Sequence, residues 1–251
     1  MTPAKNNLTV KTPAYTLTVE PGQGGRIHEW RSAGTELITS RKMFGFAVAG
    51  FWHPPKSALQ LRSPMKLEGI VPVKGGVEVR LSRILTAKDS PKFGGLKFEI
   101  THLFTGSGVT TRTKITNLLH DAAEFAFRYH NMPALLGKQQ DENGSIRFAS
   151  GEVFRRDFDQ KLITVGKEDP VLESAFKIVQ RVCKAGKLPA VLSSPKCGTA
   201  LELAFPVTPH SVVVWDDVRQ DVPTFEPVFP RTQLDPGKSV EFVMQATLKK
   251  K

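Results

Sequence analysis

Apolar and polar residues alternate with a period of two along most of this chain. Such alternation, bounded by turn residues, is typical of half-buried β-strands. It predicts strands at residues 8–10, 15–19, 36–39, 44–48, 67–71, 77–85, 96–104, 109–117, 123–129, 147–148, 162–165, 191–193, 199–205, 211–215 and 240–247. Many strands at regular spacing predict an all-β fold, a large antiparallel sandwich of two sheets with at most one or two short helices.

The segment 170–186 departs from this pattern. Its apolar residues Leu172, Phe176, Val179 and Cys183 recur at helical spacing. We therefore predict a short helix there, although every second residue of its later half also fits a strand.

Composition favours one soluble domain spanning residues 1–251. The chain is 40% apolar and contains 20 Gly and 18 Pro, which suits a turn-rich protein with a core. Nothing approaches the roughly 18 consecutive apolar residues of a membrane span. The first residues lack the apolar stretch of a signal peptide, although a trimmed leader would look the same. We expect no membrane association, and the cytoplasm is the default compartment.

The charge balance favours anionic partners. Lys and Arg number 35 against 24 Asp and Glu, a net charge of +11. Such a surface attracts anions. The basic residues are scattered, and their only run is Lys249–Lys251, so no nucleic-acid-binding motif is evident and we expect no nucleic-acid partner. A solvated surface and a preference for anionic sugars remain the two interpretations.

The two cysteines carry little functional signal. Cys183 and Cys197 flank a predicted hairpin turn and could face one another. Their spacing fits no zinc motif, so we predict two buried thiols and no metal site.

The end of the chain holds the first candidate for chemistry. An apolar run, Val212–Trp215, leads into a predicted acidic loop, and Glu226 follows between Phe225 and Pro227. The proline biases Glu226 towards an extended conformation. A carboxylate with apolar neighbours is a candidate for a raised pKa and for proton transfer. The alternative is a solvent-facing carboxylate at a strand edge.

Four motifs together suggest a family. Their order is Gly24-Gly25-Arg26-Ile27, a strand ending at Asn117, a strand ending at His130, and Glu226-Pro227 followed by Leu234-Asp235-Pro236-Gly237. This order resembles the galactose-mutarotase-like (aldose 1-epimerase) superfamily over nearly the whole chain. The resemblance implies a large β-sandwich that binds a carbohydrate.

The resemblance also implies a reaction. Opening a pyranose ring removes a proton from the anomeric hydroxyl and delivers one to the ring oxygen. A carboxylate suits the first transfer and an imidazolium the second. The motif positions assign the base to Glu226 and the acid to His130. No metal or organic cofactor is needed.

Further residues are candidates for substrate binding. The resemblance implies a binding loop at His53 and a binding carboxylate at Asp157. Trp52 could stack on a sugar face, and Arg128 and Trp215 complete the set. The alternatives are a core position for Trp52 and solvent-facing loops for His53 and Asp157.

Two departures from the family pattern leave two functions open. Met132 stands where an aromatic residue is usual, and the family's Arg motif is not recognisable, since Arg41 and Arg62 match it poorly. One hypothesis is an epimerase for a hexose or a phosphorylated or uronic sugar. The other is a carbohydrate-binding domain without turnover, because a fold alone does not establish function. Because strand ends share the rim of a sandwich, the first predicts that His130 and Glu226 lie close together.

Overall fold

A computed structural model describes residues 7–38, 45–52, 59–136, 144–148, 153–157, 161–165, 172–173, 178–184, 189–194, 197–217 and 222–250. Only the backbone is described for residues 59, 153–157, 161–165, 172–173, 178–184, 215–217 and 222–223. The strands are β1 (Leu8–Lys11), β2 (Thr16–Glu20), β3 (Arg26–Ser32), β4 (Thr35–Glu36), β5 (Val48–Trp52), β6 (Leu59–Gln60), β7 (Lys66–Val73), β8 (Gly76–Ile84), β9 (Leu96–Thr105), β10 (Gly108–Asn117), β11 (Ala123–His130), β12 (Ser145–Phe148), β13 (Val153–Asp157), β14 (Lys161–Val165), β15 (Leu172–Glu173), β16 (Ile178–Lys184), β17 (Ala190–Ser193), β18 (Thr199–Ala204), β19 (Ser211–Asp217), β20 (Val222–Leu234) and β21 (Ser239–Lys250). Two short 3₁₀ helices, η1 (Pro21–Gln23) and η2 (Ala134–Leu136), are the helices of the described part.

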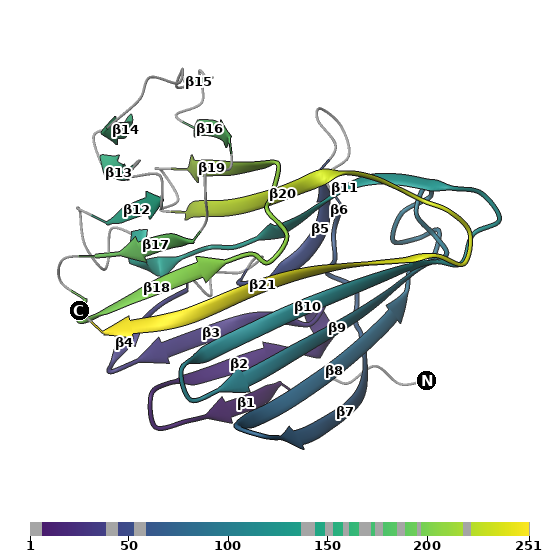
Figure 1. Cartoon of the computed structure of the whole chain (residues 1–251), viewed down its shortest axis with the longest axis horizontal. Coiled ribbons are helices and arrows are strands. Elements are labelled where there is room, and N and C mark those ends of the chain that lie inside the picture. Colours follow the sequence, from purple (N-terminus) through teal and green to yellow (C-terminus); the bar gives the residue numbers. More distant parts are fainter. Residues whose placement is uncertain are drawn as a thin grey trace.

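The strands form three antiparallel sheets (Figure 1). The largest has the order β14-β13-β12-β17-β18-β21-β10-β9-β8-β7, and the second has the order β15-β16-β19-β20-β11-β5-β6. A third sheet, β1-β2-β3-β4, is built from the first part of the chain. The predicted all-β sandwich is confirmed, and none of the described helices is long and apolar enough to cross a membrane.

Aromatic side chains join the two large sheets. Phe127 of β11 stacks on Phe242 of β21, with ring centroids 4.2 Å apart, and Phe229 of β20 packs against both rings. The Tyr129 hydroxyl donates a hydrogen bond of 2.9 Å to the Phe242 carbonyl in the same interior. Alternate residues of β11 therefore fill the space between the sheets and fix the direction of the residues between them.

Buried polar contacts attach the third sheet to the largest one. The Tyr15 hydroxyl donates to the carbonyls of Thr105 and Gly108, at 2.7 and 2.9 Å. His102 of β9 is fully buried, with Nε2 2.7 Å from the Gly25 carbonyl. His102 thus has a structural role in joining β9 to the chain before β3.

The predicted helix within 170–186 is wrong for the residues described there. The chain forms β15 and β16 instead, and β16 pairs with β19 so that Cys183 lies opposite Val212. The period of two prevails because this segment satisfies the backbone groups along the edge of β19. Cys197 is a buried thiol, as predicted, whereas the side chain of Cys183 lies outside the described residues.

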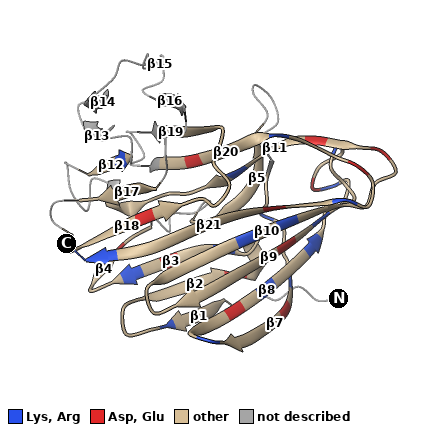
Figure 2. Ribbon diagram, in the orientation of Figure 1, with Lys and Arg blue, Asp and Glu red and all other residues tan. Residues whose placement is uncertain are grey.

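The predicted acidic loop begins later than expected, because its first residues belong to a strand. Asp216 and Asp217 end β19, so the predicted acidic loop does not begin at them. Glu226 lies inside the long strand β20, where it pairs with Val213, so its predicted extended conformation is confirmed. Figure 2 shows Lys and Arg on several strands, with Asp and Glu among them, in keeping with the scattered basic residues of the sequence.

Candidate functional site

The site is built on the face of β11 that points away from the large core. Phe125, Phe127 and Tyr129 point into the aromatic interior, and the alternation of a strand turns Arg128 and His130 the other way. Both of these polar residues are nevertheless buried. A buried Arg and a buried His on one strand face require partners, because unpaired polar groups are costly away from water.

Strand register brings those partners into a single row. Arg128 pairs with Val228 and Asn131 with Phe225, so the register between them places Glu226 of β20 opposite His130 of β11. On its other side, His130 pairs with Val48 of β5. The row therefore runs across neighbouring strands and gathers side chains that are remote in sequence.

The row continues beyond β5. Gly50 pairs with Gln60 of β6, and the Leu61 N–H donates to the Ala49 carbonyl at 2.8 Å. In the same register, the next residue, Arg62, lies beside Val48. Arg62 thus reaches the same face of the sheet as His130, two strands away.

Glu226 is the centre of the polar contacts. His130 Nε2 lies 3.2 Å from Glu226 Oε1, and the Thr224 hydroxyl donates to that same oxygen at 3.0 Å. Arg128 donates from Nη1 to Oε2. The side chains of His130, Arg128 and Glu226 are only 4–6% exposed. The prediction that His130 and Glu226 lie close together is therefore confirmed.

Trp52 covers the guanidinium of Arg128. The guanidinium carbon lies 5.0 Å from the centroid of the indole ring. This cation–π contact and the ion pair to Glu226 both fix the orientation of Arg128. Because Gly50, opposite Arg128, has no side chain, the guanidinium meets no side chain at that position.

Asn131 connects three backbone segments behind the row. Its Oδ1 accepts from the Ala47 N–H at 2.9 Å, and its Nδ2 donates to the Phe225 carbonyl at 3.0 Å. Ala47 has a φ of 58°, a left-handed conformation that is unfavourable for alanine. The fully buried amide therefore fixes the start of β5 and the residue before Glu226 together.

Burial governs the protonation of the two titratable groups. Burial raises the pKa of Glu226, although the charge of Arg128 and the Thr224 hydroxyl act against it. Burial, followed by the positive charges of Arg128 and Arg62, lowers the pKa of His130 to about 3. The imidazole is therefore neutral at pH 7, whereas the hypothesis from the sequence expected an imidazolium.

Other basic groups surround the row. Burial and the nearby charge of Arg26 lower the pKa of Arg62. Arg26 forms a 2.6 Å ion pair with Glu20, whose carboxylate also lies 3.5 Å from His28 Nδ1. Arg62 and Arg128 thus give this region a positive character suited to an anionic group.

The remaining predicted residues are less fully described. His53 lies outside the described residues, and only the backbones of Asp157 and Trp215 are described. Asp157 ends β13 in the largest sheet, rather than a loop, and Trp215 pairs with Thr224. The structure therefore brings together Glu226, His130, Arg128 and Trp52 of the predicted set.

Three residues at the site were missed from sequence. Thr224 had a usable signal, since it lies two positions before Glu226 on the same face of a strand. The signal for Asn131 was its position directly after His130 in the sequence. Arg62 had none, because its approach depends on the pairing of β5 with β6.

Comparisons with solved structures show the fold. A galactose mutarotase-like protein from Clostridium acetobutylicum superposes with a TM-score of 0.69 at 10% identity, covering 97% of this chain and 95% of that one. The Slr1438 protein from Synechocystis sp. PCC 6803 gives 0.67 at 14% identity, covering 100% and 98%. A galactose mutarotase related enzyme from Lactobacillus acidophilus gives 0.63 at 12% identity, covering 97% of each chain.

The chain therefore has the galactose mutarotase-like fold over its whole length. No protein-family model matches the sequence, and no curated protein matches it at the sequence level.

Proposed function

We propose that this protein interconverts the anomers of an aldose, with Glu226 as the base and His130 as the acid. The observation that supports this most strongly is the 3.2 Å contact between His130 Nε2 and Glu226 Oε1, on a fold shared with galactose mutarotase-like proteins. A base and an acid this close can act on two neighbouring oxygens of one sugar ring.

The proposed reaction conserves protons. The Glu226 carboxylate takes the proton of the anomeric hydroxyl, the bond between the anomeric carbon and the ring oxygen breaks, and protonated His130 gives its proton to that ring oxygen. The open-chain aldehyde rotates, and the reverse transfers close the ring with the other configuration. A carboxylate has about four lone-pair positions, and three protein donors contact Glu226, so one position remains for a substrate hydroxyl.

The electrostatics favour an anionic aldose. Together with burial, the charges of Arg128 and Arg62 keep His130 neutral. A phosphate or carboxylate on the sugar, bound beside Arg62, would offset part of this positive charge and favour the imidazolium that the reaction needs. A neutral hexose offers no such compensation, so we expect faster exchange with phosphorylated or uronic sugars.

Exchange of anomers measured by NMR, across neutral, phosphorylated and uronic aldoses, tests this proposal. Two results would support it. The wild type exchanges the anomers of at least one anionic sugar well above the buffer rate, and Glu226→Gln no longer does so. Exchange at the buffer rate with every sugar would overturn it.

A carbohydrate-binding domain without turnover is the second candidate. One observation favours it: Arg128 and Thr224 already bind the two oxygens of Glu226, which is the arrangement of a structural carboxylate. This candidate predicts measurable sugar binding in the same panel without any exchange.

A further inference from the structure

Arg62 lies in a segment without regular structure, residues 61–65, between β6 and β7. Backbone hydrogen bonds of 2.8 Å hold both ends, from the Leu61 N–H to the Ala49 carbonyl and from the Met65 N–H to the Pro21 carbonyl. The register of β5 and β6 places Arg62 beside Val48, which pairs with His130, so the position of this segment affects the candidate site.

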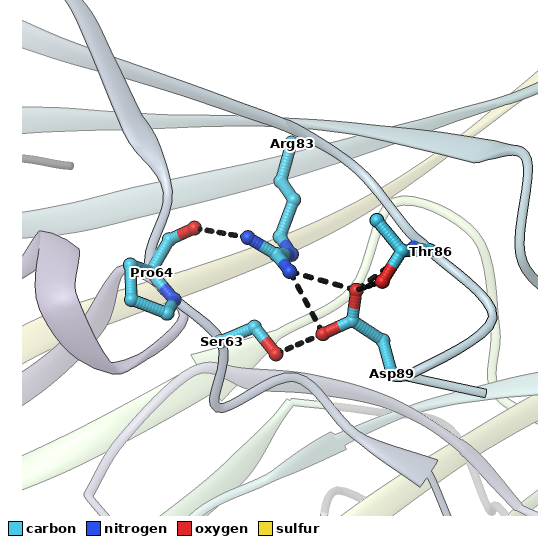
Figure 3. Close-up of polar contacts among 5 residues, drawn as sticks. All are labelled: Ser63, Pro64, Arg83, Thr86 and Asp89. Atoms are coloured by element: carbon cyan, nitrogen blue, oxygen red, sulfur yellow. Dashed lines mark hydrogen bonds and ion pairs between the residues drawn. The ribbon is translucent and has the colours of Figure 1, made fainter. Parts of the chain in front are cut away.

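The middle of the segment is bound by a carboxylate from the connection between β8 and β9 (Figure 3). Asp89 accepts a hydrogen bond from the hydroxyl of Ser63. Both oxygens of Asp89 also accept from Arg83 Nη2, at 2.8 and 2.7 Å, and Arg83 Nη1 donates to the Pro64 carbonyl at 2.8 Å. Asp89 and Arg83 together therefore hold the two residues that follow Arg62.

Asp89 is itself held rigidly. Its Oδ2 accepts from the N–H and the hydroxyl of Thr86, at 2.8 and 2.9 Å. Burial alone would raise its pKa, but hydrogen bonds from Ser63, Thr86 and Arg83 lower it well below the usual range. Its side chain is 7% exposed, and charge-assisted hydrogen bonds in such a place are stronger than those at the surface.

The other side of the segment is closed by backbone. A Cβ at Gly24 would lie 1.9 Å from the Leu61 carbonyl oxygen, so the chain of η1 packs directly against the segment. The segment thus has a close neighbour at Gly24 and a polar anchor at Asp89.

We propose that Asp89 and Arg83 are positioning residues that hold Arg62 beside His130. This rests on the proposed function in that Arg62 is taken to face the anionic group of the substrate. An arginine side chain has several rotatable bonds, and its electrostatic effect falls with distance, so a fixed Cα is needed for a defined effect.

An NMR experiment tests the positioning without any substrate. The Nε–Hε signal of Arg62 is assigned by its loss in Arg62→Ala. Ser63→Ala removes the link from Asp89 to the segment but keeps the Asp89–Arg83 pair and the bond from Arg83 to the Pro64 carbonyl. Asp89→Ala removes the Ser63 link and also leaves Arg83 without its carboxylate. We expect the Arg62 signal to move towards the position of a free arginine in both variants. A matched control, Glu124→Gln, breaks the exposed 2.7 Å pair with Arg231 between β11 and β20 and should leave the signal unchanged.

A kinetic double-mutant cycle then tests the consequence. With an anionic aldose that the wild type exchanges, Asp89→Ala should raise KM about tenfold in the presence of Arg62 and have no further effect in Arg62→Ala. Equal losses in both backgrounds, or an unchanged Arg62 signal in Ser63→Ala and Asp89→Ala, would overturn the inference. Absence of exchange in the wild type would instead overturn the proposed function, and the NMR signal would still decide the positioning of Arg62.

Discussion

His130 and Glu226 face one another across β11 and β20, with 3.2 Å between Nε2 and Oε1, and both are almost fully buried. Burial acts on them in opposite senses, since it raises the pKa of Glu226 and lowers that of His130. Arg128, on the same strand as His130, donates to Oε2 of Glu226, whereas His130 contacts Oε1. The same three groups therefore determine both the stability and the candidate chemistry of this region.

The Arg128–Glu226 pair should dominate the stability of the site. Arg128→Met leaves the Glu226 carboxylate buried without its cation, and we expect a loss of about 3–5 kcal/mol in the free energy of unfolding. Arg128→Met combined with Glu226→Gln removes both charges and should restore most of that loss. Urea denaturation measures both variants. A double variant as unstable as Arg128→Met would show that the charges are not the cause.

Glu226→Gln and His130→Asn should each slow anomer exchange about 10²–10⁴-fold, because each removes one positioned acid–base group. Gln cannot accept the proton of the anomeric hydroxyl, and Asn cannot protonate the ring oxygen. Exchange rates are compared at equal folded fractions, since Glu226→Gln also leaves Arg128 unpaired. Wild-type rates in either variant would remove that residue from the mechanism.

Two buried histidines should make the protein sensitive to acid. Burial lowers the pKa of His102 to about 4 and that of His130 to about 3, against the usual 6.5. Between the usual and the lowered values the unfolded chain binds more protons, so stability is complete above about pH 6.5 and falls as the pH drops. Each histidine contributes a slope of at most about 1.4 kcal/mol per pH unit.

Unfolding free energies at pH 7, 6 and 5 measure this effect. His130→Asn should reduce the slope, since it removes one of the two titrating groups. The raised pKa of Glu226 acts on stability in the opposite sense, so the comparison with the variant decides. An equal slope in the wild type and in His130→Asn would contradict the lowered pKa of His130.

The sequence predicts the sandwich well because each strand of its centre carries its own pattern. The alternation of buried and more exposed residues is complete in β9 and nearly so in β10, and β9, β10 and β11 lie within one residue of their predicted ends. Glu226 and His130 could be paired from motif order. Strand β16 could not be predicted in this way, because its sequence fits both a helical period and a period of two. Pairing with the edge of β19 decides between them, and that pairing is not visible in the sequence.

The environment of the candidate pair was beyond prediction for a different reason. Arg62 and Thr224 act on His130 and Glu226 through strand register, and register is set by pairing between distant parts of the chain. The neutral state of His130 follows from the combined burial and positive charge that this pairing creates. Neither quantity is encoded in the residues next to His130.

Gly24 should be required for its packing as well as its backbone conformation. Gly24 and Gly34 have φ values of 72° and 79°, so alanine is strained at both. Only at Gly24 would the new Cβ also meet the Leu61 carbonyl, whereas at Gly34 it meets nothing within 4 Å. We expect Gly24→Ala to destabilise the protein clearly more than Gly34→Ala in thermal unfolding. Equal losses would mean that the segment at Leu61 moves away without cost.

The hydroxyl of Thr224 should set the acid limit of the proposed activity. It donates to Glu226 Oε1 at 3.0 Å and thereby favours the ionised carboxylate. Thr224→Val keeps the shape of the buried side chain and removes this donor, so the already raised pKa of Glu226 should rise further.

The base must be ionised to act, so the rate is lost as the pH falls through the pKa of Glu226. In Thr224→Val this acid limb of the exchange rate should therefore lie at higher pH than in the wild type. Thr224→Ser keeps the hydroxyl and is the matched control, with its limb at the wild-type position. If the two variants show the same profile, the Thr224 hydroxyl has no part in setting the protonation of Glu226. The rate would then depend on a different titrating group.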